Sequence, residues 1–249
     1  MIFQQGWGHV VSVASPASDY LRGLPGWIKR RAPRASRVGI LHAESGTFAS
    51  QVARGVAEGA RAAGLTEIRV MMFESPLRDA GAVVRAALEP EPDLLVSVGA
   101  FQDDVAIARQ WAARPAKTAL ALVGAGLAAF GDEVGGLGEG IMGPSQWEPT
   151  AGEAPRVGPD SGWFVDAFER AFHRTPEYPA AQAFAVGVIV GECRRRAGSL
   201  ASAALLGAAH ALETTTFYGG FRLDSSTGRQ VGHGVRLVQW RDGRKHVIG

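Results

Sequence analysis

Cysteine is nearly absent from the sequence, which contains only Cys193 in 249 residues. A single cysteine cannot form an internal disulfide, and it excludes every metal or redox site that needs several cysteines. In its apolar, helical context we expect Cys193 to be a small core residue. The six histidines lie far apart in the sequence, so no local pattern indicates a metal site. His210 and Glu213 are three residues apart and are expected to form a surface or helix-end pair.

An excess of charge of one sign is also lacking, because 26 Lys and Arg face 24 Asp and Glu, for a formal charge of +2. We interpret these charges as scattered, so nucleic acid is not an expected partner. No apolar run approaches the roughly 20 residues that cross a bilayer. The N-terminal stretch MIFQQGWGHVVSVASPASDYLRG lacks the basic start, apolar run and cleavage site of a signal peptide.

Familiar catalytic motifs are missing, since the sequence has neither G-x-S-x-G nor H-E-x-x-H. The best chemical alternative is ALALVGAGLAAFGDEVGG, residues 119–136, where a strand, glycines and a helix could hold a phosphate. Its last glycine is wrongly spaced for G-x-G-x-x-G, and no partner acid stands at a suitable distance. A tight turn is the simpler interpretation, and a nucleotide-dependent enzyme using residues 124–131 is the alternative. We predict no enzyme activity, no cofactor and no metal.

Hydrophobic residues are plentiful, at 46% of the chain, and they follow an alternating pattern. Helical patterns separate apolar segments of strand length, and the helix around Val52 and Val56 is expected to end at Gly64. Such alternation predicts an α/β fold, a parallel sheet with helices on both faces. The expected strands are residues 37–41, 68–73, 93–98, 118–123 and 140–143. The expected helices of this part lie between residues 47 and 64, 79 and 88, and 104 and 113.

A change in composition divides the chain, because residues 143–162 are rich in Pro and Gly and lack periodicity. Three helical segments follow, near residues 162–173, 179–197 and 200–213, and the chain ends in short runs with hairpin signals at SSTG and RDGR. We expect residues 1–15 as a remnant of a first lobe with its crossover, and residues 16–143 as a complete α/β lobe. Residues 144–222 would form the helical part of the first lobe, and residues 223–249 a terminal hairpin returning to the complete lobe.

Five stretches carry a family resemblance in the same order along nearly the whole chain. They are RVGILHAESGTFASQVARGVAEGARAAG, PDLLVSVGAFQDDVAIARQW, GEGIMGPSQWEP, FVDAFERAFHRTPEYPAAQAFAVGVIV and GGFRLDSSTGRQVGHGVRLVQWRDGR. The sequence resembles the type I periplasmic solute-binding proteins of ABC transporters, in the branch that binds branched-chain amino acids and amides. This resemblance implies a two-lobed periplasmic clamp that binds a small solute, without turnover, and presents it to a membrane permease. A ligand-sensing regulatory module of the same fold is the alternative.

The sequence also departs from this family, whose members carry a further segment ahead of the point where this chain starts. The resemblance therefore implies one complete lobe and one lobe represented mainly by its helices. We expect apolar residues of those helices to lack a packing partner, so that the chain associates with itself or keeps this half mobile. These residues are Phe164, Phe168, Phe184, Val188, Ile189, Leu205 and Leu206.

The candidate site follows from the expected sheet, because ligands bind beyond the carboxyl ends of parallel strands. The loops at that edge are residues 43–48, 100–103 and 124–126, and none places a nucleophile beside a base. They hold small hydroxyls at Ser45 and Thr47, backbone N–H groups at helix starts, and the aromatic rings of Phe48 and Phe101. The pattern predicts binding of a solute rather than chemistry on it.

Several of the candidate residues could either contact the solute or serve the fold. By the resemblance, Phe48 and Phe101 stand where amino-acid binders place aromatic residues against the ligand, although packing explains them equally well. Asp103 and the following Asp104 either face a cationic group or cap a helix. The ligand-contact candidates are Ser45, Thr47, Phe48, Ala100, Phe101, Gln102, Asp103, Gly126 and Trp147.

Two of these candidates carry further expectations from the resemblance. Amino-acid binders place an acid for the ligand ammonium after the fourth strand, where this sequence has Gly126. An α-amino acid is therefore in doubt as the ligand. Trp147 lies where the chain leaves the complete lobe, so it either walls the ligand site or packs at a hinge.

Overall fold

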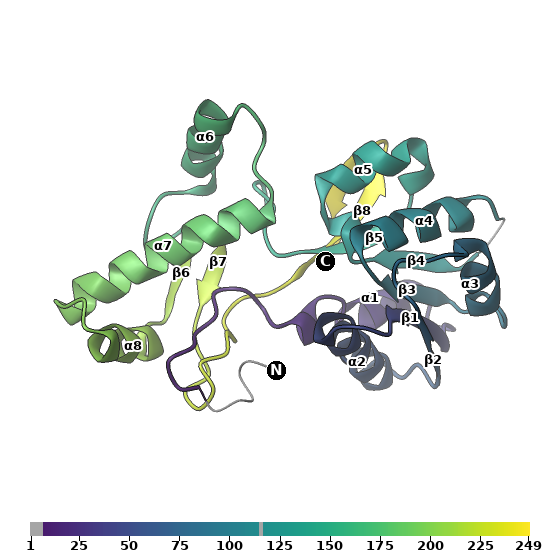
Figure 1. Cartoon of the computed structure of the whole chain (residues 1–249), viewed down its shortest axis with the longest axis horizontal. Helices are drawn as coiled ribbons and strands as arrows, with labels where there is room; N and C mark the ends of the chain where they lie inside the picture. The colour runs from purple at the N-terminus through teal and green to yellow at the C-terminus, as the bar shows by residue number, and fades with distance from the viewer. Residues whose placement is uncertain (1–6, 115–116) are drawn as a thin grey trace. The chain divides into compact units, whose positions relative to one another are not determined.

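The chain folds into two compact units in a computed structural model that describes residues 7–114 and 117–249. We call Ala17–Ser145 with Arg236–Gly249 the sheet unit, and residues 7–16 with Gln146–Val235 the helical unit (Figure 1). The expected terminal hairpin was to begin at residue 223. Residues 223–235 instead belong to the helical unit, and the return to the sheet unit begins at Arg236.

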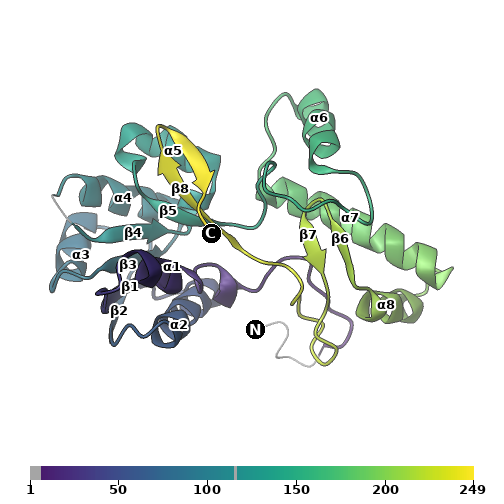
Figure 2. The same cartoon turned by 180° about the vertical axis from the view of Figure 1, so that it is seen from behind.

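A seven-stranded sheet forms the centre of the sheet unit, in the order β2-β1-β3-β4-β5-β8-β9. The first five strands in this order run parallel, and β8 and β9 join antiparallel at the edge beside β5 (Figure 2). The predicted parallel sheet is confirmed, as is the hairpin at RDGR, where Arg241 pairs with Arg244. The strands are β1 (Arg37–Ala43), β2 (Glu67–Phe73), β3 (Leu94–Val98), β4 (Ala119–Leu122), β5 (Met142–Ser145), β8 (Arg236–Arg241) and β9 (Arg244–Val247).

Helices cover both faces of this sheet. The chain moves from β1 to β2 in one direction and from β3 to β5 in the other, so right-handed crossovers place helices on opposite faces. One face carries α1 (Leu24–Arg31) and α2 (Thr47–Ala62) (Figure 1). The other carries α3 (Ala80–Ala87), α4 (Phe101–Ala112) and α5 (Ala128–Val134). Helix α1 was not predicted, and α4 begins at Phe101 rather than Asp104. Helix α2 ends two residues before Gly64, whose φ of 77° lies in the left-handed region expected beyond a helix end.

Two glycines allow α2 to approach closely the segment that precedes α1. A Cβ atom on Gly55 would lie 1.8 Å from the Ser18 carbonyl oxygen, and one on Gly59 would lie 2.0 Å from that of Arg22. Any side chain at these positions would force the two backbones apart. The buried core beneath them is continuous, and β3 contributes its whole length to it.

The helical unit contains α6 (Ser161–Phe172), α7 (Tyr178–Ala197) and α8 (Ser202–Ala211), close to the three predicted helical segments. A two-stranded antiparallel hairpin, β6 (Thr214–Thr216) and β7 (Gly219–Phe221), was not predicted. The SSTG segment forms a turn, held by the Asp224 carboxylate and closed by the single bridge Leu223–Gln230.

Two small apolar clusters stabilise this unit. One gathers Trp147, Phe164 and Phe217, and the other gathers Ile189, Cys193 and further residues. Burial of Cys193 agrees with the prediction of a core residue, and desolvation raises the pKa of its thiol. The expectation that Phe164 and Ile189 lack partners is wrong. Both are buried, because the rings of Phe164 and Phe217 pack 4.6 Å apart and Ile189 joins the second cluster.

Candidate functional site

The carboxyl ends of β1, β3 and β4 meet at one edge of the sheet unit, and each leads into a candidate loop. After β1, residues 44–48 are all exposed. The Glu44 amide donates a hydrogen bond of 2.9 Å to the Phe73 carbonyl of β2, which fixes the start of this loop. The loop after β1 is therefore held to β2 at its first residue and is exposed along the rest of its length.

Helix α2 begins in this loop without a side-chain cap. Gly46 occupies the N-cap position with φ 86° and ψ 146°, a conformation that favours glycine. By contrast, the Asp79 carboxylate caps α3 by accepting a hydrogen bond of 2.8 Å from the Ala82 amide. The first amides of the 16-residue α2, with the exposed residues Ser45 and Thr47 beside them, form a positive helix end that favours an anion.

The two candidate aromatic residues differ in exposure. Phe48 is 43% exposed and packs edge-on against Tyr20, with ring centroids 5.3 Å apart. Phe101 is half-buried against the core, and its ring lies beside Gly124. Phe48 is thus presented at the surface of the sheet unit, whereas Phe101 borders the core with Ala100 and Gln102 exposed beside it.

Asp103 is buried and organises two loops. One carboxylate oxygen accepts hydrogen bonds from the Ser75 hydroxyl at 2.5 Å and the Ala100 amide at 3.0 Å. The other accepts from the Leu77 amide at 2.8 Å. This arrangement favours the capping interpretation of Asp103 over a contact with the solute.

Asp104 lies deeper and is fully buried. One carboxyl oxygen accepts a hydrogen bond of 2.7 Å from the Gly124 amide, while its Oδ1 has no hydrogen-bond partner among the described residues. Burial raises the pKa of this carboxyl well above its ordinary value, and the neighbouring Asp103 raises it further. The sequence offered capping as one role for Asp104, but it gave no signal for this link between α4 and the turn after β4.

The turn Gly124–Gly126 is closed to ligands within the sheet unit. All three residues are buried, and the Gly126 carbonyl accepts a hydrogen bond of 3.0 Å from the Lys245 ammonium. A Cβ atom on Gly126 would lie 1.8 Å from the Pro144 carbonyl oxygen, so this glycine serves packing rather than the predicted ligand contact. This turn is also unsuited to the alternative of nucleotide binding. The Gly124 amide, which would have to donate a hydrogen bond to a phosphate, already donates one to the Asp104 carboxyl.

Trp147 belongs to the core of the helical unit, where it is 2% exposed. Its ring packs edge-on against Phe164 and Phe217, and its indole N–H lies 3.4 Å from the Ser161 hydroxyl. This burial favours the packing interpretation over a wall of the ligand site, and Trp147 lies directly after the point where the chain leaves the sheet unit.

A buried polar cluster next to Trp147 was missed by the sequence reasoning. The Gln146 side-chain oxygen accepts hydrogen bonds from the Ser15 amide at 2.9 Å and the Tyr218 hydroxyl at 3.0 Å. The His233 ring stacks on Tyr218 at 4.4 Å. The cluster thus joins three segments that are more than 70 residues apart in sequence, and only a hydrogen-bond pattern could reveal it.

Comparison with known proteins places this geometry in a family. The periplasmic binding protein family matches residues 6–245. The chain belongs to this family. No curated protein sequence matches the chain significantly.

Solved structures of the periplasmic binding protein fold resemble the chain at low identity. A leucine-binding protein from Thermotoga maritima is 16% identical with a TM-score of 0.84, and the match covers 98% of this chain and 68% of that one. An ABC-transporter solute-binding protein from R. palustris, in complex with benzoate, is 15% identical with a TM-score of 0.77, covering 96% and 64%. A branched-chain amino acid transporter substrate-binding protein from Streptococcus pneumoniae, in complex with isoleucine, is 16% identical with a TM-score of 0.77, covering 98% and 68%.

The chain therefore spans about two thirds of the length of these periplasmic binding proteins. Within residues 7–114 and 117–249, no helix is long and apolar enough to span a membrane. The same described residues contain no group of three or more His, Cys, Asp or Glu that could hold a metal ion.

Proposed function

We propose that this chain binds a small organic acid outside the cytoplasm, for uptake by an ABC transporter, and that it does so without turnover. The solute's carboxylate would bind at the start of α2, against the amides that follow Gly46 and the hydroxyls of Ser45 and Thr47. The observation that carries this proposal is the exposed start of α2, where the N-cap residue Gly46 supplies no side-chain cap. Membership of the periplasmic binding protein family supports the transport role and the extracytoplasmic location.

The chemistry around the turn after β4 supports an acid without an α-ammonium group. At the position where amino-acid binders are expected to carry an acid, this chain has Gly126. Its carbonyl accepts a hydrogen bond from the Lys245 ammonium. The exposed ring of Phe48 offers an apolar wall for the rest of the solute. Glu44 is the one acid of the loop at residues 43–48, and it gives the test of an amino-acid ligand.

Isothermal titration against leucine, isoleucine, benzoate, other aromatic acids and their neutral amides tests the ligand class. We expect binding of a carboxylate without an ammonium group, loss of binding for its amide, and unchanged solute after prolonged incubation. Binding of leucine that Glu44→Gln abolishes would overturn the choice of ligand class. Repeated conversion of any solute would overturn the assignment as a binding protein.

A charge placed at the start of α2 tests the site itself. Thr47→Asp should reduce affinity at least tenfold, since its carboxylate competes for the same helix end, while slightly stabilising the helix. Ser202→Asp puts the same charge at the start of α8 and should leave binding unchanged.

Phe48→Ala should weaken binding by about 1 to 3 kcal/mol through lost apolar contact, with the fold retained. Equal binding by Thr47→Asp and the unmodified chain would exclude this site.

A further inference from the structure

Positive charge is concentrated in one segment, although the chain as a whole is nearly balanced. Residues 20–43 contain six Lys and Arg and no Asp or Glu. Three of these cations, Lys29, Arg30 and Arg31, form the last turn of α1. The interpretation of scattered charge is therefore wrong for this part of the molecule.

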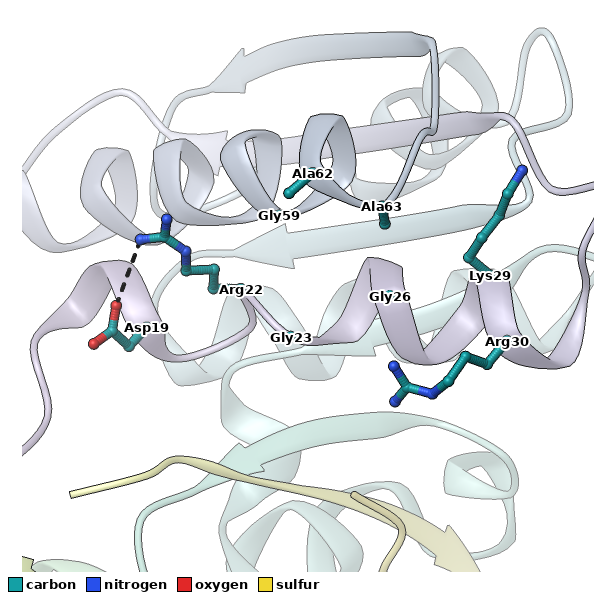
Figure 3. A pocket seen from close by; sticks show the side chains of 9 residues that line it. All are labelled: Asp19, Arg22, Gly23, Gly26, Lys29, Arg30, Gly59, Ala62 and Ala63. Carbon is teal, nitrogen blue, oxygen red and sulfur yellow. Dashed lines mark ion pairs between the residues drawn. The ribbon is translucent and has the colours of Figure 1, made fainter. Parts of the chain in front are cut away.

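A groove of about 740 Å³ lies between α1 and α2, next to these cations. Figure 3 shows Arg22 at one end of the groove and Lys29 at the other, while the Arg30 side chain runs back along α1 on the side away from α2. Small residues line the space between, including Gly26 on α1 and Ala62 on α2. The groove is therefore hollow because the middle of its walls carries no large side chains, and its end at Lys29 and Arg30 is cationic.

The charges at the two ends differ in how they are neutralised. Arg22 lies 3.2 Å from Glu58 and 4.0 Å from Asp19. Lys29 donates a hydrogen bond of 2.7 Å to the Ala35 carbonyl, which leaves its charge uncompensated. Among the described residues, no ion pair involves Lys29 or Arg30. The end of the groove at the last turn of α1 thus carries a net positive charge.

This groove is separate from the proposed solute site. Only five residues connect the end of α1 to Arg37, the first residue of β1, so the cationic end lies at the amino edge of the parallel strands. The solute loops lie at their carboxyl edge. A ligand could occupy the groove without contacting Ser45, Thr47 or Phe48.

We propose that the groove between α1 and α2 docks an acidic segment of another protein. The carboxylates of such a segment would face Lys29 and Arg30 at the last turn of α1, and arginine binds carboxylates bidentately. A membrane surface is the poorer partner, because the apolar residues Leu24, Trp27 and Ile28 of α1 are buried and are not presented for insertion.

Fluorescence anisotropy of a labelled hexaglutamate peptide, with hexaglutamine as the neutral probe, tests this proposal on the full chain. We expect binding of hexaglutamate only, weakening as salt rises from about 20 to 200 mM. Arg30→Glu should reduce the affinity at least tenfold. Arg85→Glu is the matched control, because Arg85 is exposed in the last turn of another eight-residue helix of the same unit, and it should change affinity less than twofold.

A second variant separates the hollow from its charge. Ala62→Leu fills the groove without altering charge and should reduce hexaglutamate affinity at least fivefold, with thermal unfolding and solute titration confirming an intact sheet unit. Equal losses for Arg30→Glu and Arg85→Glu, or no effect of Ala62→Leu, would overturn the groove as the site. Binding to phosphatidylglycerol vesicles that exceeds peptide binding and is insensitive to Ala62→Leu would show a membrane contact instead.

Discussion

The sheet unit and the helical unit bury their apolar residues in different ways. In the sheet unit, one continuous cluster extends through the seven strands and the helices on both faces. In the helical unit, the buried residues form two small clusters beside a two-stranded hairpin. A wide sheet gives every helix a flat apolar surface to cover, whereas α6 and α7 cover each other and a narrow hairpin.

The two units also differ in where their exposed apolar residues lie. In the sheet unit, Phe48 lies on α2 and Val247 on β9, and only Val70 and Met72 share an element, the edge strand β2. In the helical unit, Trp7, Val11 and Leu200 lie outside the helices, whereas the five other large exposed residues lie on α6 and α7. They are Trp163, Phe172, Phe184, Val186 and Val190. Concentration on two helices marks a face that is incompletely covered within the unit, while single exposed residues are ordinary on any protein surface.

Two glycines in helices give the largest expected contrast between the units. Gly59→Ala in α2 should destabilise the sheet unit by about 3 kcal/mol, because its Cβ would lie 2.0 Å from the Arg22 carbonyl oxygen. Gly187→Ala in α7 meets no atom within 4 Å and should stabilise that helix by about 0.5 to 1 kcal/mol. Urea unfolding with hydrogen exchange assigned to each unit measures both. Changes of the same sign at the two positions would contradict the difference in packing.

Two buried carboxyls should give the units opposite dependence on pH. Burial raises the pKa of Asp104 above its ordinary 3.8, so the folded state holds this proton more tightly and its contribution to stability is lost as pH rises through the raised pKa. Hydrogen bonds from Arg195 and Arg196 lower the pKa of Glu192 from 4.5 to about 2, so its contribution is present above pH 4.5 and is lost as pH falls toward 2.

Thermal unfolding of Asp104→Asn and Glu192→Gln between pH 2.5 and 7 tests these signs. Relative to the unmodified chain, Asp104→Asn should gain stability as pH rises. Glu192→Gln should be less stable at pH 7 and should approach the unmodified chain at the acid end. Parallel curves for the two variants would show that neither carboxyl titrates as the structure indicates.

The sequence predicted the sheet unit best, because its strands are continuous apolar runs and its helices have regular spacing. Every predicted strand of this unit is present within two residues at each end. Helix α1 was missed since its apolar residues are few, although Pro25 in its first turn and the basic residues in its last turn were usable signals. In the helical unit, the run of β-branched Thr214–Thr216 before a short turn could have indicated the hairpin.

The candidate site was only partly predictable. Loop positions follow from strand ends, so Ser45, Thr47 and Phe48 were correctly placed in the loop after β1, which the structure shows to be exposed. The roles of Asp103 and Gly126 depend on partners distant in sequence, such as Ser75 and Lys245, and no local pattern reveals those contacts. The packing of Trp147 likewise depends on Phe217, which is 70 residues away.

The smallest expected effect on unfolding concerns the exposed face of α6 and α7. Phe172→Ser with Val190→Ser should change the free energy of unfolding by only about 0.5 kcal/mol, because Phe172 is 59% and Val190 50% exposed. The same double variant should nevertheless reduce self-association, since it removes apolar surface that would be buried between copies. Met72→Ser is the control, because Met72 is 63% exposed on β2 and is not part of this face.

Light scattering over a range of protein concentrations measures the association, and hydrogen exchange measures protection of residues 162–213. We expect the unmodified chain to form concentration-dependent oligomers that the double variant shifts toward monomer and that Met72→Ser leaves unchanged. Clusters as small as those around Phe164 and Ile189 provide limited apolar burial, so covering this face should also strengthen amide protection in α6 and α7. A monodisperse monomer with strong protection across these residues would instead show that two small clusters suffice to stabilise the helical unit.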